Sequence, residues 1–294
     1  MQSFQTACVR AGSHFILAGD RSDQRRTLDN PEPVNWSVLI LYDLKNGEPL
    51  AFMHETHLSG FRVGATTGLA VSQIARSDSK VLGLYGTGNQ ALPNCQAICN
   101  VRPIERVQVY SPSTAHREAF LKRMSGEKVE VILLDEPEAV VEGADIICCA
   151  TNAKTPVLRG AWLSPGQTVV TIANSDVLDR RSEVDEETFS RADDIVINDW
   201  DSVIANQQLE LLEPIEKGLV NLERVHLLSD LVAGKTQVQQ KPDNIIYYKN
   251  NTGLAIQFAA CGAILHRKLL AEGTNRTIPR DWFASKKYSI APAP

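Results

Sequence analysis

The stretch VLGLYGTGNQALPNCQAI, residues 81–98, passes from an apolar run through a glycine-rich turn into a segment of helical character. Its GTGNQA core has glycine, glycine and alanine at a spacing that permits a tight turn, a close ligand approach and close helix–strand packing. Such loops bring backbone amides and a helix N-terminus against the pyrophosphate of a dinucleotide. A lone motif of this kind is a weak signal, and an ordinary glycine-rich turn is the alternative. The predicted cofactor loop comprises Gly86, Gly88, Asn89, Gln90 and Ala91.

The chain around this loop alternates short apolar runs with helical stretches. The runs are mostly uninterrupted and rich in β-branched residues, as expected for strands that are buried on both faces. Several are separated by stretches of helical character, such as 114–124 and 137–144. This alternation is typical of a doubly wound parallel sheet. The expected strands are 80–86, 106–111, 129–134, 144–150, 168–173 and 194–198.

A smaller part of the chain lies on both sides of this sheet in the sequence. The runs 37–42 and 49–55 flank Asn46-Gly47, a dipeptide suited to a hairpin turn. Helices are expected over 63–75 and within 252–273, where apolar residues recur at helical spacing. The first 35 residues commit to no element. Before the last helix, the sequence predicts a helix over 201–218 and a strand or short turn over 224–235.

The composition excludes several classes of function. The 294 residues carry 30 basic and 35 acidic side chains without a basic block, so neither nucleic acid nor an anionic membrane is expected as a partner. No apolar run reaches the roughly 18 residues of a membrane span, and no signal peptide is recognised. The six cysteines form no metal-binding pattern, so we expect no metal and reduced thiols in the cytoplasm. A small-molecule partner is the remaining expectation.

The end of the strand after the loop bears on the choice of cofactor. In dinucleotide-binding folds an acidic residue here holds the ribose 2′-hydroxyl, whereas hydroxyl or basic side chains accept a 2′-phosphate. The strand ends VYSPSTAHRE, with no carboxylate at 111–114. The sequence therefore favours NADP(H) over NAD(H), with Ser111, Ser113 and Arg117 as contacts. Capping of the next helix by Ser113 or Thr114 is a compatible alternative.

Two later strand ends finish in small polar residues. Ligands of open parallel sheets bind beyond the carboxyl ends of the strands. We therefore expect Thr151, Asn152 and Asn174 to border the ribose and the nicotinamide. The alternative for the asparagines is an ordinary role in turns.

Three ordered segments carry a resemblance to a known family. SGFRVGATTGLA (59–70), VLGLYGTGNQA (81–91) and LLSDLVAGK (227–235) resemble the R-T-x-A, G-x-G-x-Q-A and D-x-x-G-K motifs of the ornithine cyclodeaminase/mu-crystallin family. NGEPLAFMH and VYSPSTAHREAF are also similar to that family, so the likeness covers roughly 34–270. Together the ordered motifs are far more specific than the glycine loop alone.

The resemblance implies a fold, an assembly and a chemistry. Its members have a Rossmann domain inserted in a split domain that serves dimerisation and substrate binding, so a homodimer is expected. Their reactions join nicotinamide hydride transfer to amino or imino acids: cyclodeamination of ornithine, reduction of cyclic ketimines, and alanine or iminosuccinate redox reactions. The expected fold class is α/β, with a Rossmann-type doubly wound sheet domain at 79–250 and a smaller split α+β dimerisation/substrate domain at 1–78 plus 251–294.

The resemblance also assigns roles to single residues. Arg62 matches the arginine that binds the substrate carboxylate, a task suited to a planar fork of donors; a structural ion pair is the alternative. Asp230 matches the catalytic aspartate near the substrate nitrogen or the attacking water, where a partly dry pocket raises the pKa of a carboxyl; capping of a turn is the alternative. Lys235 either binds substrate or closes its loop.

The sequence departs from the family pattern in two places. Val63 replaces the family threonine, and no counterpart of a substrate-facing lysine is recognised before the hairpin. Arg25 and Arg26 are the candidate replacements, although a guanidinium does not release its proton as an ammonium does. Lysine-dependent deamination of a diamino acid is therefore disfavoured.

We expect an NAD(P)-dependent oxidoreductase that reduces the C=N bond of a small imino acid (a ketimine), or catalyses the reverse oxidation of an amino acid. The cofactor carries the hydride chemistry and the protein aligns it with the substrate. Two alternatives stay open. One is a cyclodeaminase-type lyase that releases ammonia from ornithine with bound NAD. The other is a non-catalytic NADPH-binding protein, which the short N-terminal region would suit.

Overall fold

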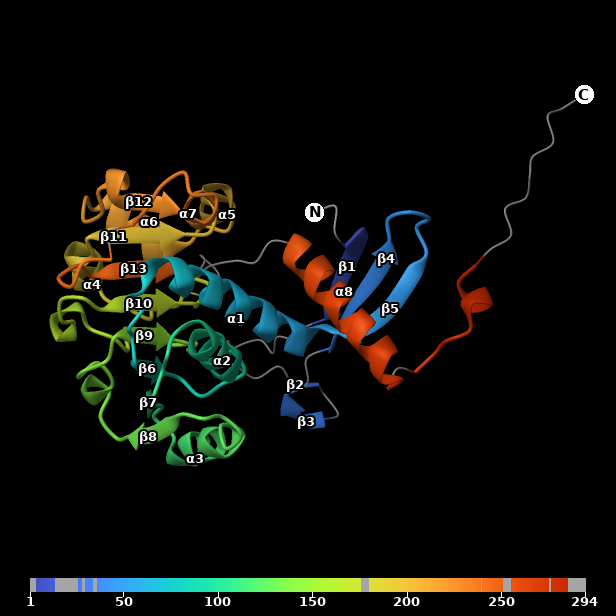
Figure 1. Ribbon diagram of the computed structural model, residues 1–294, viewed down its shortest axis with the longest axis horizontal. Coiled ribbons are helices and arrows are strands. Elements are labelled where there is room, and N and C mark those ends of the chain that lie inside the picture. The colour runs from blue at the N-terminus through green and yellow to red at the C-terminus, as the bar shows by residue number, and fades with distance from the viewer. Residues whose placement is uncertain are drawn as a thin grey trace, which may run out of the picture.

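The computed structural model describes residues 4–13, 26–27, 30–33, 36–175, 180–238, 240–250, 255–274 and 276–284. Figure 1 shows a large parallel sheet surrounded by helices, a small antiparallel sheet covered by helix α8, and helix α1 running between them. In the chain that the structure describes, every helix is too short or too polar to cross a lipid bilayer.

The large sheet has eight strands in the order β12-β11-β13-β10-β9-β6-β7-β8, and every neighbouring pair is parallel. From β6 the chain builds β7 and β8 on one side, then returns to place β9 on the other. This reversal beside β6 is the switch point at which ligands of such sheets bind. The strands are β6 (Val81–Tyr85), β7 (Arg106–Tyr110), β8 (Glu130–Leu134), β9 (Ile146–Cys149), β10 (Thr168–Thr171), β11 (Asp194–Ile197), β12 (Val225–Leu227) and β13 (Ile246–Lys249).

The expected α/β fold with a doubly wound sheet is confirmed, and two strands join the six expected ones. β12 resolves the ambiguity between strand and turn. β13 was not expected, although it lies near the centre of the sheet, between β11 and β10. Its short sequence IYYK ends in a lysine, and periodicity alone does not mark so short a run as a strand.

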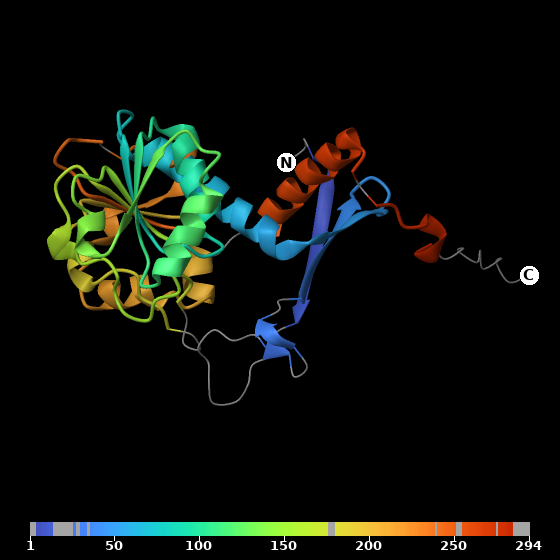
Figure 2. The same ribbon diagram turned by 90° about the horizontal axis from the view of Figure 1, so that it is seen from below.

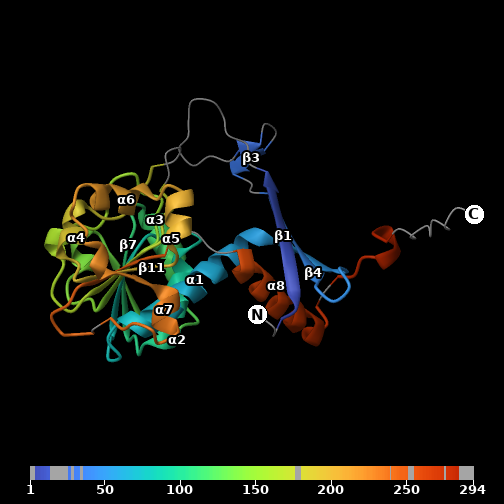
Figure 3. The same ribbon diagram turned by 90° about the horizontal axis from the view of Figure 1, so that it is seen from above.

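Both faces of the large sheet are covered, which explains the uninterrupted apolar runs. Successive residues of one strand enter opposite cores: Ile146 packs on the side of α2 and α3, and Ile147 on the side of α4 and α6. Figure 3 shows α2 and α6 on opposite sides of the sheet. The covering elements are α2 (Ala91–Val101), α3 (Thr114–Arg123), α4 (Glu186–Arg191), α5 (Trp200–Ala205), α6 (Leu209–Glu216) and α7 (Leu228–Val232).

Two helical expectations are corrected. The stretch 137–144 forms only the short 3₁₀ turn η1 (Glu138–Val140), because Gly143 adopts a positive φ of 66° soon after it. The expected helix over 201–218 is two helices, α5 and α6. Gln207 has a φ of 47° between them, which no continuing α-helix adopts.

The small sheet contains β1 (Thr6–Ser13), β4 (Trp36–Asp43) and β5 (Pro49–His54), all antiparallel. The hairpin expected at Asn46-Gly47 is confirmed, and Gly47 has a φ of 73°. β1 falls in the stretch for which no element was expected. A separate two-stranded pair is formed by β2 (Arg26–Thr27) and β3 (Asn30–Pro33).

One face of the small sheet packs against α8 (Ala255–Glu272), as Figure 2 shows. Leu39, Leu41 and Met53 are buried there with Phe258. A Cβ on Gly262 of α8 would lie 3.2 Å from the side chain of Leu39 and 3.2 Å from that of Leu41. The helix therefore lies close to the strands at a glycine.

The opposite face of the small sheet is apolar and only partly covered, by the ring of Phe283 at 5.3 Å from that of Phe52. Val9, Ile40 and Phe52 are paired in register across β1, β4 and β5, and so point to the same side. Val9 is 53% exposed and Phe52 44% exposed. No described part of the chain covers this row completely.

Helix α1 (Glu55–Ile74) begins at Glu55 rather than at the expected Val63. Gly60 and Gly64 face the first turn of α2 at Pro93; a Cβ on Gly64 would lie 2.4 Å from the carbonyl oxygen of Pro93. The two glycines thus allow the backbones of α1 and α2 to come into direct contact. At the other end of α1, the guanidinium of Arg102 donates to three of the last carbonyls, those of Val71, Ser72 and Ala75.

Candidate functional site

The glycine loop lies at the switch point between β6 and β9. Gly86 has a φ of 93°, and its N–H donates to the carbonyl of Tyr110 on β7 at 2.8 Å. A Cβ there would lie 2.3 Å from the carbonyl oxygen of Ala150, so only glycine fits. At Gly88, by contrast, nothing lies within 4 Å of the Cβ position, which leaves room for a ligand to approach. The expected strand, loop and helix are therefore confirmed; cofactor binding stays a prediction.

The start of α2 follows directly. Ala91 is the first helical residue and fully buried, as close packing of helix on strand requires. The carbonyl of Gln90, the N-cap residue, accepts hydrogen bonds from the backbone N–H and side-chain amide of Asn94. Asn89 lies against α1, since a Cβ on Gly60 would be 3.4 Å from its carbonyl oxygen.

At the end of β7 the structure bears out the capping alternative. The hydroxyl of Ser113 accepts a hydrogen bond from the N–H of His116 and caps α3. Arg117 is buried, donates to the carbonyl of Ser111 and the hydroxyl of Thr114, and pairs with Asp135. A phosphate bound by Arg117 would have to share its guanidinium with these groups, so this contact stays a prediction.

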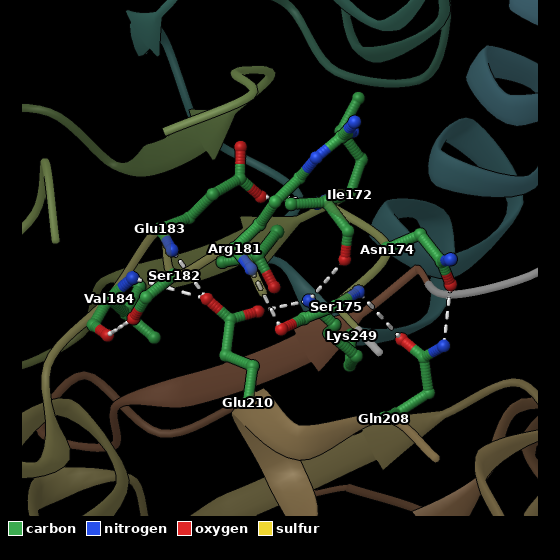
Figure 4. A network of polar contacts seen from close by, with 12 residues as sticks. Ile172, Asn174, Ser175, Arg181, Ser182, Glu183, Val184, Gln208, Glu210 and Lys249 are labelled. Atoms are coloured by element: carbon green, nitrogen blue, oxygen red, sulfur yellow. Dashed lines mark hydrogen bonds and ion pairs between the residues drawn. The ribbon is translucent and has the colours of Figure 1, made fainter. Parts of the chain in front are cut away.

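The ends of β9 and β10 lie together on the β9 side of the switch point, where the sequence predicts the nicotinamide. They are joined by Glu183, which is fully buried and was not expected from the sequence. One carboxylate oxygen accepts from the N–H (2.7 Å) and hydroxyl (2.9 Å) of Thr151, and the other from the N–H groups of Ile172 and Ala173 (both 2.8 Å). The side chain of Asn174 accepts from that of Gln208 (Figure 4). Asn152 lies in the same segment as Thr151.

A second buried carboxylate and a buried lysine support Glu183 from behind (Figure 4). Glu210 accepts the backbone N–H of Glu183 and pairs with Lys249 at the end of β13. Lys249 also donates to the carbonyl of Ala173 at 2.7 Å. Burial and repulsion from Glu210 raise the pKa of Glu183 to about 7, whereas Lys249 and the donated N–H groups lower it.

A cluster of two guanidiniums lies in the N-terminal half of α1 and the neighbouring strand β1. Arg62 lies 4.9 Å from the ring centre of Phe258, and Arg10 of β1 lies 3.8 Å from the same ring. Arg10 pairs with Glu55, whereas the buried Nε of Arg62 has no hydrogen-bond partner. Burial first, then the charge of Arg10, lower the pKa of Arg62, while Glu55 raises it. Two cations and one carboxylate leave a positive excess that suits an organic anion.

Arg10 was missed because the sequence around it predicted no element. The expected replacements for the family lysine, Arg25 and Arg26, give no comparable site: Arg25 lies outside the described residues, and only the backbone of Arg26 is described. An arginine within an amphipathic strand would have been the signal, had that strand been recognised.

Asp230 lies on α7, which contacts α1. Its carboxylate is partly exposed and pairs with Lys235 at 3.1 Å. The N–H of Lys235 donates to the carbonyl of Asp230, and Gly234 adopts a φ of 68° in the turn between them. The loop-closing alternative for Lys235 therefore has direct support, and its role toward a substrate stays a prediction, as does the catalytic role of Asp230.

Comparisons with known proteins identify a family and several relatives. The model of the ornithine cyclodeaminase/mu-crystallin family matches residues 18–272. The chain is 29% identical over 244 residues to a Delta(1)-pyrroline-2-carboxylate reductase of Bacillus cereus, covering 82% of this chain and 73% of that one.

Two solved structures have the same architecture. The Thermococcus litoralis Delta(1)-pyrroline-2-carboxylate reductase, in complex with NADH and L-proline, matches with a TM-score of 0.74 and 28% identity, over 83% of this chain and 75% of that one. An archaeal alanine dehydrogenase dimer with bound NAD matches in fold with a TM-score of 0.75 and 23% identity, over 94% of this chain and 81% of that one. The chain therefore belongs to the ornithine cyclodeaminase/mu-crystallin family.

Proposed function

We propose that this protein is an NAD(P)-dependent oxidoreductase that reduces the C=N bond of a small imino acid, or oxidises the corresponding amino acid. One observation carries the proposal: α1, the helix of Arg62, packs directly on the cofactor loop where Gly60 meets the carbonyl of Asn89. The guanidinium of Arg62, which would bind an anion, and the glycine loop, which would bind a dinucleotide, thus come from segments whose backbones are in contact. The likeness to two Delta(1)-pyrroline-2-carboxylate reductases supports this reaction class.

The residues divide the work as follows. Arg62 binds the substrate carboxylate through its fork of donors, and Arg10 adds a second positive charge beside it. This fixes the orientation of the imine carbon. A bound nicotinamide cofactor supplies or accepts the hydride. Asp230 exchanges the proton at the substrate nitrogen, and its pairing with Lys235 holds the carboxylate in place.

NADP(H) is the proposed cofactor preference. No carboxylate stands at 111–114 to repel a 2′-phosphate, and the hydroxyls of Ser111 and Ser113 are present at the strand end. The solved reductase that this chain resembles was captured with NADH. Titration of the purified protein with NADH and NADPH tests the preference. Equal or tighter binding of NADH would contradict it.

A substrate panel tests the reaction. Cyclic and linear ketimines, assayed by oxidation of NADPH and NADH, should include one that is turned over, and Arg62→Ala and Asp230→Asn should each reduce its rate strongly. Lys217→Ala, on the far side of the large sheet, is the control. Unchanged rates in both site variants contradict the mechanism. Ammonia release from ornithine without net cofactor reduction would identify a lyase, and tight NADPH binding without any turnover would identify a non-catalytic protein.

A homodimer in the cytoplasm is proposed, built through the open face of the small sheet. The row Val9, Ile40 and Phe52 is apolar, with Val9 and Phe52 exposed and Ile40 half-buried, and a second copy can cover it by twofold packing of sheet on sheet. The archaeal alanine dehydrogenase of the same fold is a dimer. Phe52→Glu should then give a monomer in sedimentation, whereas Leu121→Glu, exposed on α3, should not.

The domain division is proposed on the same basis, with the dinucleotide domain at 79–250 and the substrate and dimerisation domain at 1–78 plus 251–294. In this division, α1 belongs to the substrate domain although it packs on α2. Expression of 79–250 alone should give a protein that binds the cofactor. An insoluble fragment would indicate that α1 is part of the cofactor domain.

A further inference from the structure

We propose that Glu183 is the positioning residue of the nicotinamide half of the dinucleotide site, an inference that rests on the proposed function above. Its carboxylate joins two backbone segments that are remote in sequence, the one after β9 at Thr151 and the one after β10 at Ile172 and Ala173. Both segments stand at the carboxyl edge of the sheet, on the β9 side of the switch point. One side chain therefore bridges the two segments beyond the point where β9 and β10 stop pairing.

The chemistry of a carboxylate explains why this position holds Glu. Four donors converge on it, two on each oxygen: three backbone N–H groups and one hydroxyl. An ionised carboxylate accepts all four, since it presents only acceptors. An amide would place an NH₂ against two of these donors. Glu183→Gln therefore separates one of the two strand ends from its anchor.

A second layer fixes Glu183 itself. Glu210 on α6 accepts the N–H groups of Glu183 and Val184, and Lys249 joins Glu210 to the carbonyl of Ala173 (Figure 4). The same segment is thus held from both sides, through its N–H by Glu183 and through its carbonyl by Lys249. Such duplicated anchoring of one irregular segment suits a ligand-facing wall that must not shift.

The two halves of the cofactor site are held by different groups. The adenosine half faces Ser111 and Ser113 at the end of β7, on the other side of β6 from Glu183. Ser113 is fixed by α3, whose cap it forms. Loss of the Glu183 anchor should therefore weaken contacts to the nicotinamide half and leave the adenosine half intact.

A comparison of two ligands tests this division. NADH carries both halves, whereas ADP-ribose lacks the nicotinamide. We expect Glu183→Gln to raise the Kd of NADH by about tenfold or more, the loss of one or two charge-assisted hydrogen bonds, with the Kd of ADP-ribose changed by less than about twofold. Glu187→Gln, an exposed neighbour on α4, should change neither. Equal weakening of both ligands, or no change in the Kd of NADH, overturns the proposal.

A measurement on the unaltered protein decides the matter if Glu183→Gln does not fold. Protonation of Glu183 removes one acceptor, so the ratio of the Kd of NADH to that of ADP-ribose should rise as pH falls from about 8 to about 6. The groups that face Glu183 are Glu210, Lys249, Tyr247, Cys148 and Cys149. A ratio independent of pH overturns the proposal. If the unaltered protein binds neither ligand, the proposed function itself fails, which is a distinct result.

Discussion

The side-chain amide of Asn250 donates a hydrogen bond to the hydroxyl of Thr67 at 2.8 Å, and a second to the carbonyl of Val63 at 3.0 Å. Asn250 directly follows β13, whereas Thr67 and Val63 belong to α1. The hydroxyl of Thr67 in turn donates to the side chain of Asn94 on α2. A buried polar chain therefore joins the large sheet, the helix of Arg62 and the helix that follows the glycine loop.

Asn250→Ala should destabilise the protein by about 2–3 kcal/mol, because it leaves the carbonyl of Val63 and the hydroxyl of Thr67 with fewer partners in a buried site. Urea unfolding measures the change. Asn206→Ala, which removes a bond from an exposed asparagine on the other face of the sheet, should stay within about 0.5 kcal/mol of the original protein. Equal effects of the two substitutions would show that the polar chain adds nothing.

Gly86→Ala should abolish cofactor binding and destabilise the fold by several kcal/mol. Its positive φ is one cause, and the approach of a Cβ to the carbonyl of Ala150 is the other. Gly218→Ala measures the effect of the positive φ without the steric contact, since Gly218 has a similar φ of 72° but nothing within 4 Å of its Cβ position. We expect about 1 kcal/mol for Gly218→Ala in urea unfolding. If Gly86→Ala still binds NADPH with the original Kd, the loop is no cofactor site.

Arg62→Lys should raise the KM for the imino acid by about 10- to 100-fold, because an ammonium keeps the charge but loses the fork. Arg10→Ala should have a smaller effect, since Arg10 is already paired with Glu55. If both groups bind the same carboxylate, the double variant should lose less than the sum of the single losses in transition-state free energy. Strict additivity in steady-state kinetics would place Arg10 outside the substrate site.

The stability of the protein should depend on the ionisation of Glu183. Its pKa is raised to about 7 in the folded state from 4.5, so the folded chain retains a proton that the unfolded chain releases between these values. The stabilising contribution of this proton is complete below about pH 4.5 and is lost as pH rises through about 7, on the order of 3 kcal/mol. Glu183→Gln should lack this dependence. Parallel pH profiles of unfolding free energy for the two proteins would contradict it.

The local sequence pattern was sufficient to predict those elements whose conformation depends on residues close together in the chain. The glycines at 86 and 88, the hairpin glycine at 47 and the uninterrupted strands each state a physical requirement at one position, and the structure places each as expected. The family motifs then identified the architecture, because several such requirements in a fixed order seldom coincide by chance.

The errors occurred where long-range contacts decide the structure. β13 forms because β10 and β11 flank it, and its lysine is buried only because Glu210 arrives from α6. Arg10 meets Arg62 through the ring of Phe258, which lies 196 residues further along the chain than Arg62 and 248 residues further than Arg10.

The sequence by itself determined the strand–loop–helix unit at 81–98, because backbone conformation is a property of single positions, and its resemblance to the family supplied the candidates Arg62 and Asp230. Only the tertiary structure decided that Glu183, Glu210 and Lys249 meet at the ends of β9, β10 and β13 and that Asn250 fastens α1 to the sheet. Buried polar groups are stable only with partners, and those partners come from segments that the fold brings together.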